Sequence, residues 1–440
     1  MSANENLNAA DIRVILDKQR AAFLASEPWT AEQRCELIDR AIGLLVDYQH
    51  EIIEALSADF GHRSHDFSRM VDVLGPLASL KYTKAKIAGW MQPDHRATDR
   101  GEAWVQYQPL GVVGILTAWN FPGNMVFNGL AGALAAGNRV MIKVSEYNPK
   151  TSALLARIFR EVYAEDEVAI ITGGPDIGHA FSQQPFDHLL FTGASSIGKH
   201  VMRAAAENLV PVTLELGGKS PTIISRTADL KVAVTKILTG KLHNAGQICL
   251  APDYVFVPEE QQAAFVAAAR EVAATLYPTL LENPDYTSLI NARHFERLHG
   301  YLNEARDAGV ELIELNPADE DFSAQPHHKM APSLLRNPGD ELQVMQDEIF
   351  GPLLPFKTYQ SFAEVVSYIN SHPRPLGLYY FGNDAGEESF VLNRTTSGGV
   401  TLNDVLRHGK SVLRSVDGPD AMRPPYSEQV RQFVGSMIKR

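Results

Sequence analysis

Cys249 has the residue type and the surroundings of a nucleophile. It follows a His-Asn-Ala-Gly-Gln-Ile run, between a helix expected over 230–244 and a strand expected over 254–257. A cysteine in a glycine-containing turn can expose its sulfur and receive backbone N–H dipoles, and both effects favour the reactive thiolate. A lone cysteine is more often a small buried hydrophobe, and Cys35, in a charged helix, fits that interpretation. We therefore take Cys249 as the candidate nucleophile.

Glu215 is the candidate general base. It stands between two leucines in Leu214–Pro221, at the end of an expected strand and before a Gly-Gly turn. Apolar neighbours raise the pKa of a carboxyl group toward the range that is useful to a general base. The same residue could also be an edge-strand carboxylate that points to solvent, and the segment by itself does not separate the two interpretations.

Two other segments have features of a nucleotide site. Phe191–Lys199 is typical of a strand, a glycine turn and a helix start, whose free N–H groups hold phosphate. It meets most of the P-loop pattern, but His200 stands where a Ser or Thr must coordinate Mg²⁺, so a dinucleotide pyrophosphate fits better. In Ile142–Pro149, Glu146 follows a strand, where α/β nucleotide folds bind a ribose diol; a solvated loop carboxylate is the alternative.

Composition narrows the class of protein. The chain has 440 residues, more than one hydrophobic core usually organises, and a net charge of -12, which argues against nucleic acid as the main partner. Its apolar runs are far shorter than the roughly 20 residues of a membrane span, and its start lacks the pattern of a secretory signal. We expect a soluble cytoplasmic protein with no membrane partner.

A bound metal is not expected. The chain has only two cysteines, which excludes a disulfide scaffold and a cysteine-rich zinc site. The pairs His62/His65 and His327/His328 lack partner ligands at fixed spacing.

The elements that must position these residues follow a regular order. Residues 8–93 have the spacing of successive helices, and the sequence around Trp104 favours a strand or hairpin. From Gly111 on, short apolar runs alternate with helices, and a second alternating region extends over about 222–400. Strands are expected at 111–116 and 139–144, a short helix at 167–172, and longer helices at 125–136, 150–163, 259–276 and 292–308. Such alternation predicts a parallel sheet covered on both faces.

Taken together, these segments resemble the NAD(P)-dependent aldehyde dehydrogenase family. The matching motifs are, in order, Gly111–Pro122, Ile142–Pro149, Phe191–Lys199, Leu214–Pro221, Gly246–Cys249, Glu348–Pro352 and Thr396–Asp404. The stretches ADFGHRS, PFDHLLFTG and ENLVPVTLELGGKSP look most like the coniferyl aldehyde dehydrogenase branch.

The resemblance implies a role for each motif. Cys249 would attack the aldehyde carbon, the Asn120 amide and the Cys249 N–H would hold the oxyanion, and Glu215 would activate water to release the acid. The cofactor would be NAD, with NADP an alternative. Its contacts would come from Trp119, Lys143, Glu146, Gly193, Ala194, Ser195, Gly198, Leu216, Gly217, Glu348 and Phe350. The substrate would be a small, aromatic, coniferyl aldehyde-like aldehyde.

The implied fold is α/β and aldehyde dehydrogenase-like. Residues 1–98 and 110–214 would form a Rossmann-type NAD-binding domain and 215–405 an α/β catalytic domain. Residues 99–109 and 406–440 would form a small oligomerisation element that pairs two subunits in a homodimer.

The sequence departs from the family pattern at several positions. Ala118 and Val144 replace customary prolines, and neither side chain would do chemistry. After Asp404 the usual Pro-Phe-Gly-Gly stretch, Ser-Gly-x-Gly turn and terminal strand are absent. Such an atypical tail, natural or frameshifted, would weaken the dimer. A non-catalytic relative that keeps fold and cofactor is therefore the second hypothesis, and a P-loop phosphotransferase is the third.

Overall fold

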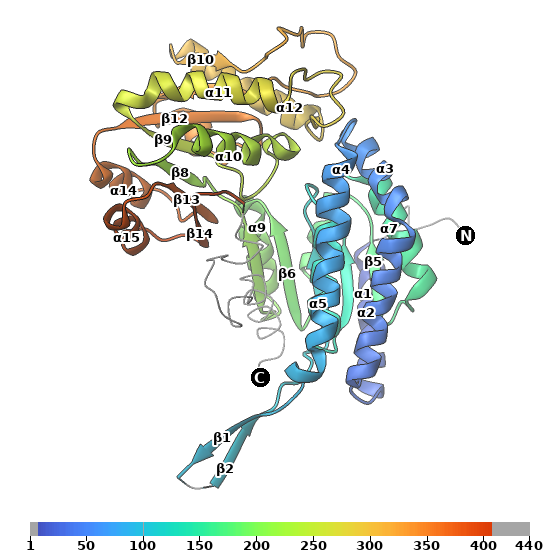
Figure 1. Ribbon diagram of the computed structural model, residues 1–440. Coiled ribbons are helices and arrows are strands. Elements are labelled where there is room, and N and C mark those ends of the chain that lie inside the picture. Colours follow the sequence, from blue (N-terminus) through green and yellow to red (C-terminus); the bar gives the residue numbers. More distant parts are fainter. Residues whose placement is uncertain (1–7, 100, 407–440) are drawn as a thin grey trace. The chain divides into compact units, whose positions relative to one another are not determined.

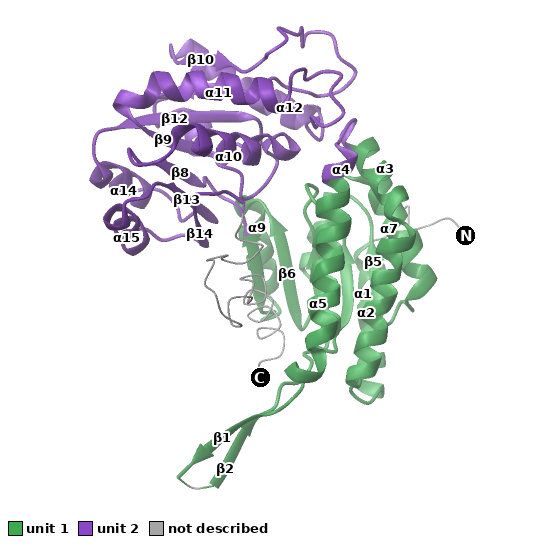
Figure 2. Cartoon of the chain, viewed as in Figure 1, with its two compact units in different colours: residues 1–59, 68–215, 427–440 green, residues 60–67, 216–426 purple. Residues whose placement is uncertain are grey.

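The computed structural model describes residues 8–99 and 101–406 (Figure 1). The described chain forms two compact units. Unit 1 contains residues 8–59 and 68–215, and unit 2 contains residues 60–67 and 216–406 (Figure 2). The short segment 60–67 belongs to unit 2 although it lies within the helical N-terminal part of the sequence. The predicted atypical tail from residue 407 onward lies outside the described residues.

Unit 1 is built on a five-stranded sheet in the order β5-β4-β3-β6-β7. The strands are β3 (Val112–Leu116), β4 (Arg139–Lys143), β5 (Val168–Ile171), β6 (His188–Gly193) and β7 (Val212–Leu216). β3 is parallel to β4 and to β6, and β4 is parallel to β5. Every residue of β3 and β4 is buried, which is the property of strands in a parallel sheet.

Helices of unit 1 pack against this sheet and against one another. They are α1 (Ala9–Ala25), α2 (Ala31–Asp47), α3 (Gln49–Phe60), α5 (Gly75–Trp90), α6 (Pro122–Ala135), α7 (Pro149–Val162), α8 (Pro175–Ser182) and α9 (Ser195–Ala206). A one-turn helix α4 (His65–Ser68) and a π-helix (Arg69–Leu74) precede α5. α6 is rich in small residues, and Gly129 lets it approach Ile115 of β3 closely, since an added Cβ would lie 3.0 Å from that side chain. The core joins α2, α3, α5, α6 and α7 to β3, β4 and β5.

A two-stranded hairpin extends from unit 1. β1 (Asp94–Thr98) pairs antiparallel with β2 (Gly101–Val105), and every residue of both strands is exposed. The sequence predicted a strand or hairpin here, which the structure confirms. Its role in oligomerisation stays a prediction.

Unit 2 contains a seven-stranded sheet in the order β10-β11-β12-β9-β8-β13-β14. The strands are β8 (Pro221–Ile224), β9 (Tyr254–Pro258), β10 (Glu311–Glu314), β11 (Ser333–Arg336), β12 (Leu353–Tyr359), β13 (Gly377–Phe381) and β14 (Gly399–Leu402). All neighbouring strands run parallel except β10, which lies antiparallel to β11 at one edge. The sheet is therefore mixed at one edge, where the alternation of elements alone predicted parallel strands.

Each face of this sheet has its own hydrophobic core, because alternate residues of a strand point to opposite faces. Residues of one face pack with α10 (Leu230–Leu242) and α11 (Gln262–Leu276). Residues of the other face pack with α12 (Ala292–Asp307), α13 (Gln343–Gln346), α14 (Phe362–Asn370) and α15 (Ala385–Arg394). A 3₁₀ turn (Glu259–Gln261) precedes α11. The predicted covering of both faces is thus present in unit 2.

Two helix predictions are wrong. Residues 167–172, predicted as a short helix, contain strand β5, whose four residues are buried beside β4 in the sheet. The helix expected over 230–244 ends at Leu242 and continues as a 3₁₀ turn, His243–Gly246. Asn244 and Ala245 have φ values of 50° and 51°, which no right-handed helix contains. This turn leads directly to the candidate nucleophile.

Candidate active site

In unit 1 the predicted site residues gather at one edge of the sheet. Leu116, the last residue of β3, is paired with Lys143 of β4 and with Phe191 of β6, so these strands end side by side. Asn120 follows β3, Glu146 follows β4, and the glycine turn follows β6. Ligands of open α/β sheets bind at such carboxyl ends, where the strand order reverses on either side of the first strand.

Lys143 and Glu146 form a charged pair at this edge. The Lys143 side chain is buried, and its Nζ lies 3.6 Å from Glu146 Oε2 and donates to the carbonyl of Val144 at 2.7 Å. Burial lowers the pKa of Lys143, while Glu146 opposes that shift. An ammonium and a carboxylate side by side offer a donor and an acceptor to vicinal hydroxyls, so the pair fits a ribose diol.

The start of α9 fits a phosphate group. Ala194 is the N-cap residue and no side chain caps the helix, so the first N–H groups are available to an anion. At Gly193 an added Cβ would lie 2.7 Å from the ring of Phe191, so a side chain is excluded there. The N–H of Gly198 donates to the carbonyl of Ala194 at 2.9 Å and is therefore used within the helix. Gly193–Ser195 thus fits a pyrophosphate better than Gly198 does.

Glu215 is the last residue of unit 1 and the fourth of the five residues of β7. Its side chain is exposed to solvent, yet the surrounding protein desolvates the carboxylate enough to raise its pKa. This is the direction that its leucine neighbours predict and that a general base requires. Glu215 therefore has the solvent exposure of an edge-strand carboxylate and also the raised pKa that suits a general base.

In unit 2, Cys249 follows a left-handed turn. Asn244, Ala245 and Gly246 all have positive φ, with values of 50°, 51° and 75°. A Cβ on Gly246 would collide with the carbonyl of Gly351, so glycine is required at that position. Non-glycine residues in this conformation persist only where the surroundings hold them.

Gln247 is the residue that holds this turn, and sequence reasoning assigned it no role. Its side chain is fully buried. Nε2 donates to the carbonyl of Asn244 at 2.8 Å and to that of Ser288 at 3.0 Å, and Oε1 accepts from the N–H of Ile290 at 3.0 Å. Its place in the Gly-Gln-Ile-Cys motif was the available signal, but two of these three partners, Ser288 and Ile290, lie 41 and 43 residues further along the chain.

Glu348 lies against the Gly217-Gly218 turn within unit 2. A Cβ on Gly217 would overlap its carboxylate, and the backbone of Gly218 forms a hydrogen bond with it. Burial, together with the charge of Asp253, raises the pKa of Glu348 to about 8. Two of the predicted cofactor contacts, Gly217 and Glu348, are thus adjacent.

A partly buried ion pair, Lys219 with Asp253, contacts the segment that carries Glu348. Lys219 Nζ donates a hydrogen bond to Asp253 Oδ1. It also donates to the carbonyl of Val344 at 2.7 Å and to that of Asp347 at 2.9 Å. Asp253 Oδ2 accepts from the N–H of Ile349 at 2.9 Å. Lys219 lies in the Leu214–Pro221 motif and Asp253 shortly after the Gly246–Cys249 motif, but nothing in the sequence indicates that the two side chains pair.

The other predicted residues are Trp119, Asn120, Leu216 and Phe350. Trp119 lies 6.4 Å from the ring of Tyr147, and Asn120 is 2 % exposed. Leu216 ends β7, and Phe350 has a φ of 47°. Asn120 and Glu215 belong to unit 1 and Cys249 to unit 2, so the predicted catalytic residues come from both compact units.

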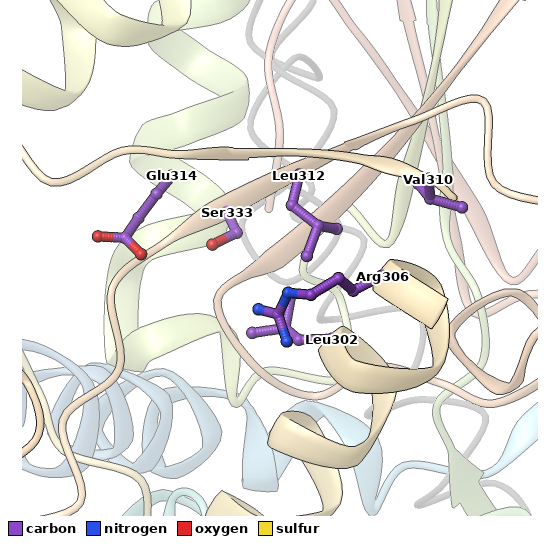
Figure 3. Close-up of a pocket in the computed structure, with 6 residues that line it drawn as sticks. All are labelled: Leu302, Arg306, Val310, Leu312, Glu314 and Ser333. Carbon is purple, nitrogen blue, oxygen red and sulfur yellow. The ribbon is translucent and has the colours of Figure 1, made fainter. Parts of the chain in front are cut away.

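A cavity of about 330 Å³ lies elsewhere in unit 2 (Figure 3). Leu302 and Arg306 of α12 line it together with residues of β10 and β11 at the sheet edge. None of the predicted site residues contributes to it. Over 8–99 and 101–406, no cluster of His, Cys, Asp or Glu is arranged to hold a metal, and no helix has the length and apolarity of a membrane span.

The fold and these motifs define an NAD(P)-dependent oxidoreductase of aldehydes. The model of the aldehyde dehydrogenase family matches residues 2–415, and the chain belongs to this family. It is 46% identical to a probable coniferyl aldehyde dehydrogenase of Caulobacter vibrioides over 100% of both proteins. It is 50% identical to the coniferyl aldehyde dehydrogenase of Pseudomonas sp., over 91% of this chain and 84% of that protein.

Solved structures show the same fold. The substrate-bound state of Staphylococcus aureus AldH has a TM-score of 0.85 and 33% identity, covering 90% of this chain and 86% of that chain. A Mycobacterium tuberculosis aldehyde dehydrogenase complexed with NAD⁺ has a TM-score of 0.82 and 26% identity, covering 90% and 83%. These likenesses confirm the predicted aldehyde dehydrogenase-like α/β fold.

Proposed function

We propose that this enzyme oxidises an aromatic, coniferyl aldehyde-like aldehyde to the carboxylic acid, with NAD as the preferred cofactor. The observation that supports the substrate class is the 46% identity to a protein named as a probable coniferyl aldehyde dehydrogenase and the 50% identity to one named as a coniferyl aldehyde dehydrogenase. The observation that carries the chemistry is the clamped left-handed turn that presents Cys249.

In the proposed reaction, the Cys249 thiolate attacks the carbonyl carbon and forms a C–S bond. The carbonyl oxygen becomes an oxyanion, which the Asn120 amide and the backbone N–H of Cys249 would stabilise. NAD, when bound, would supply the acceptor for the hydride of this carbon. Loss of that hydride would re-form the carbonyl, and Cys249 would then carry a thioester.

The second half-reaction is hydrolysis of that thioester. Glu215 would accept a proton from water, and the hydroxide equivalent adds to the acyl carbon. Breakage of the C–S bond releases the acid and restores the Cys249 thiolate. The raised pKa of Glu215 suits this role, because a carboxylate whose pKa is closer to the working pH is a stronger base.

The cofactor would lie along unit 1. Lys143 and Glu146 would hold the adenosine ribose, and Gly193–Ser195 the pyrophosphate, with Trp119 beside them. Leu216, Gly217, Glu348 and Phe350 would hold the nicotinamide half. The adjacency of Gly217 and Glu348 supports the last assignment.

The test is a panel of aromatic and aliphatic aldehydes, each with NAD and with NADP, followed by NADH or NADPH absorbance. We expect coniferyl aldehyde and related hydroxycinnamaldehydes to have the highest kcat/KM with NAD. A protein that binds NAD but oxidises no member of the panel would instead be the non-catalytic relative, a hypothesis that the missing motifs after Asp404 suggest.

We also propose that two copies pair through the β1–β2 hairpin. The hairpin exposes Trp104 (58%) and Val105 (39%), apolar surface that a second subunit would cover. Light scattering of the parent and of Trp104→Lys tests this assignment. A dimer that loosens in the variant is expected, and an equally tight dimer would remove the hairpin from the interface.

A further inference from the structure

Strand β13 carries two adjacent tyrosines that face opposite cores. Tyr379 lies in the core with α10 and α11, and Tyr380 lies in the core with α14 and α15. Both side chains are buried, with 0% and 1% exposure. They differ in what their hydroxyl groups contact.

The Tyr379 hydroxyl contacts the Cys249 turn. It donates to the carbonyl of Leu250 at 2.5 Å, and Leu250 directly follows Cys249. The same oxygen forms a hydrogen bond with the backbone of Leu406. Burial raises the pKa of Tyr379, and the charge of Cys249 raises it further, so the phenol and the thiol are within electrostatic range.

The Tyr380 hydroxyl contacts α15 instead. It lies 3.1 Å from Glu387 Oε2 and 3.5 Å from the carbonyl of Asp384. It therefore has the same residue type, strand and burial as Tyr379, but its partners are unrelated to Cys249.

We propose that Tyr379 is a positioning residue for Cys249. Its hydroxyl holds the chain just after Cys249, while Gln247 holds the turn just before it. Gln247 fixes the residues before Cys249 through Asn244, Ser288 and Ile290. Tyr379 fixes the residue after it. The inference rests on the proposed function, in which Cys249 supplies both the sulfur nucleophile and an oxyanion N–H.

The physical reason is the geometry of a peptide unit. The Leu250 carbonyl belongs to the chain segment that immediately follows Cys249, so anchoring it limits backbone movement at Cys249 and holds the Cα atom that carries the thiol side chain. The hydrogen bond to the Leu250 carbonyl is partly buried, and a carbonyl withdrawn from water needs a donor. A tyrosine packed on a strand supplies one with only two rotatable side-chain bonds. The hydrogen bond to Leu406 also ties this hydroxyl to the segment that follows β14, where the sequence leaves the family pattern.

The test compares Tyr379→Phe with Tyr380→Phe, each of which deletes one buried hydroxyl from the same strand. The readout is the rate at which iodoacetamide alkylates Cys249, measured by peptide mass spectrometry without cofactor or aldehyde. Cys35 in the same molecule is the internal reference, because it lies in α2 of unit 1, whereas both tyrosine hydroxyls contact residues of unit 2. We expect Cys249 alkylation to slow about 10-fold in Tyr379→Phe, with Cys35 unchanged, and to change less than twofold in Tyr380→Phe.

Steady-state kinetics supply a second readout. We expect Tyr379→Phe to lower kcat about 10-fold while the KM for NAD stays within twofold of the parent value. Equal alkylation rates in both variants and the parent, or an equal decrease in both variants, would overturn the proposal. Because alkylation needs neither cofactor nor substrate, a parent that oxidises no aldehyde would refute the proposed function while leaving this comparison informative.

A variant that retains the hydroxyl covers the case in which Tyr379→Phe does not fold. 3-Fluorotyrosine at position 379 preserves the packing and makes the phenol a stronger donor, and 3-fluorotyrosine at position 380 is its matched control. A change in the Cys249 alkylation rate at 379 only is expected, and the same rate at both positions would contradict the assignment.

Discussion

The two units place their site residues at opposite ends of parallel strands. In unit 1, Asn120, Glu146 and Ser195 follow β3, β4 and β6, at the carboxyl ends. In unit 2, Cys249 and Glu348 precede β9 and β12, at the amino ends. In unit 1 the chain runs from each of these strands through the site residue to the start of a helix. In unit 2 it runs from the end of a helix through the site residue to the strand.

This difference decides what the backbone can offer to a ligand. At the start of a helix such as α9, N–H groups are unpaired and point outward, so anion binding needs little further structure. The end of a helix such as α10 offers carbonyl groups instead. Before Cys249 the chain passes through a 3₁₀ turn and three successive residues with positive φ. We infer that the turn before Cys249 depends on hydrogen bonds from side chains such as Gln247, whereas the start of α9 can bind an anion through its own N–H groups.

Replacement of Cys249 should have the largest effect. Cys249→Ala removes the only thiol among the motifs, so aldehyde oxidation should fall at least about 1,000-fold, on the order of the loss of a covalent nucleophile. Cofactor binding, which we assign mostly to unit 1, should stay nearly intact by NAD titration. Cys35→Ala is the control and should retain full turnover. A Cys249→Ala variant with a tenth of the parent rate would disprove the covalent mechanism.

Glu215→Gln should slow thioester hydrolysis about 10²–10⁴-fold, as expected for loss of a general base. Hydride transfer should change less, so stopped-flow absorbance should show an NADH burst followed by slow turnover. In the parent, hydrolysis should weaken as the pH falls below the raised pKa of Glu215, because the neutral carboxyl cannot accept a proton. The variant should lack this acidic limb. Equal slowing of both phases would exclude the base role.

Gln247→Leu tests the clamp on the nucleophile turn. It removes hydrogen bonds to three buried backbone groups, so the free energy of unfolding should fall by about 2–4 kcal/mol. The alkylation rate of Cys249 should fall about 10-fold as the left-handed turn relaxes. Chemical denaturation and alkylation mass spectrometry measure the two effects.

Gln19 is the matched control in unit 1. Its buried side chain donates to the carbonyls of Val140 and Glu165 at 3.0 and 2.9 Å. Gln19→Leu should lower stability without altering Cys249 alkylation. If both variants slow alkylation equally, the clamp is not specific to unit 2, and the contrast between the units loses its support.

Glu146→Gln should have the smallest effect. In the parent, Glu146 would repel the 2′-phosphate of NADP, while Lys143, 3.6 Å away, softens that repulsion. We therefore expect NAD to be preferred in the parent rather than required. The variant should raise kcat/KM for NADP relative to NAD about 10-fold, or about 1.4 kcal/mol. Comparable kcat/KM for both cofactors in the parent would contradict the role of Glu146.

Much of the fold was predictable because its signals are local. The apolar runs that became β3, β4 and β9 and the periodic segments that became α7, α11 and α12 were assigned within a few residues. The edge strand β10, the early end of α10 and the strand β5, predicted as a short helix, were not. The first pairs with a strand about 20 residues away, and the second depends on a turn that Gln247 stabilises from outside the helix.

The sequence by itself determined the candidate groups of the site. Cys249, Glu215, Glu146 and Glu348 each lie in a short motif whose residue types suggest a chemical role. Only the tertiary structure decided which buried groups hold those motifs. Tyr379 reaches Leu250 across 129 positions of sequence, and Lys219 reaches Asp347 across 128. No local pattern records such pairs, because a hydrogen bond depends on distance in space and the packed sheet alone brings these atoms together.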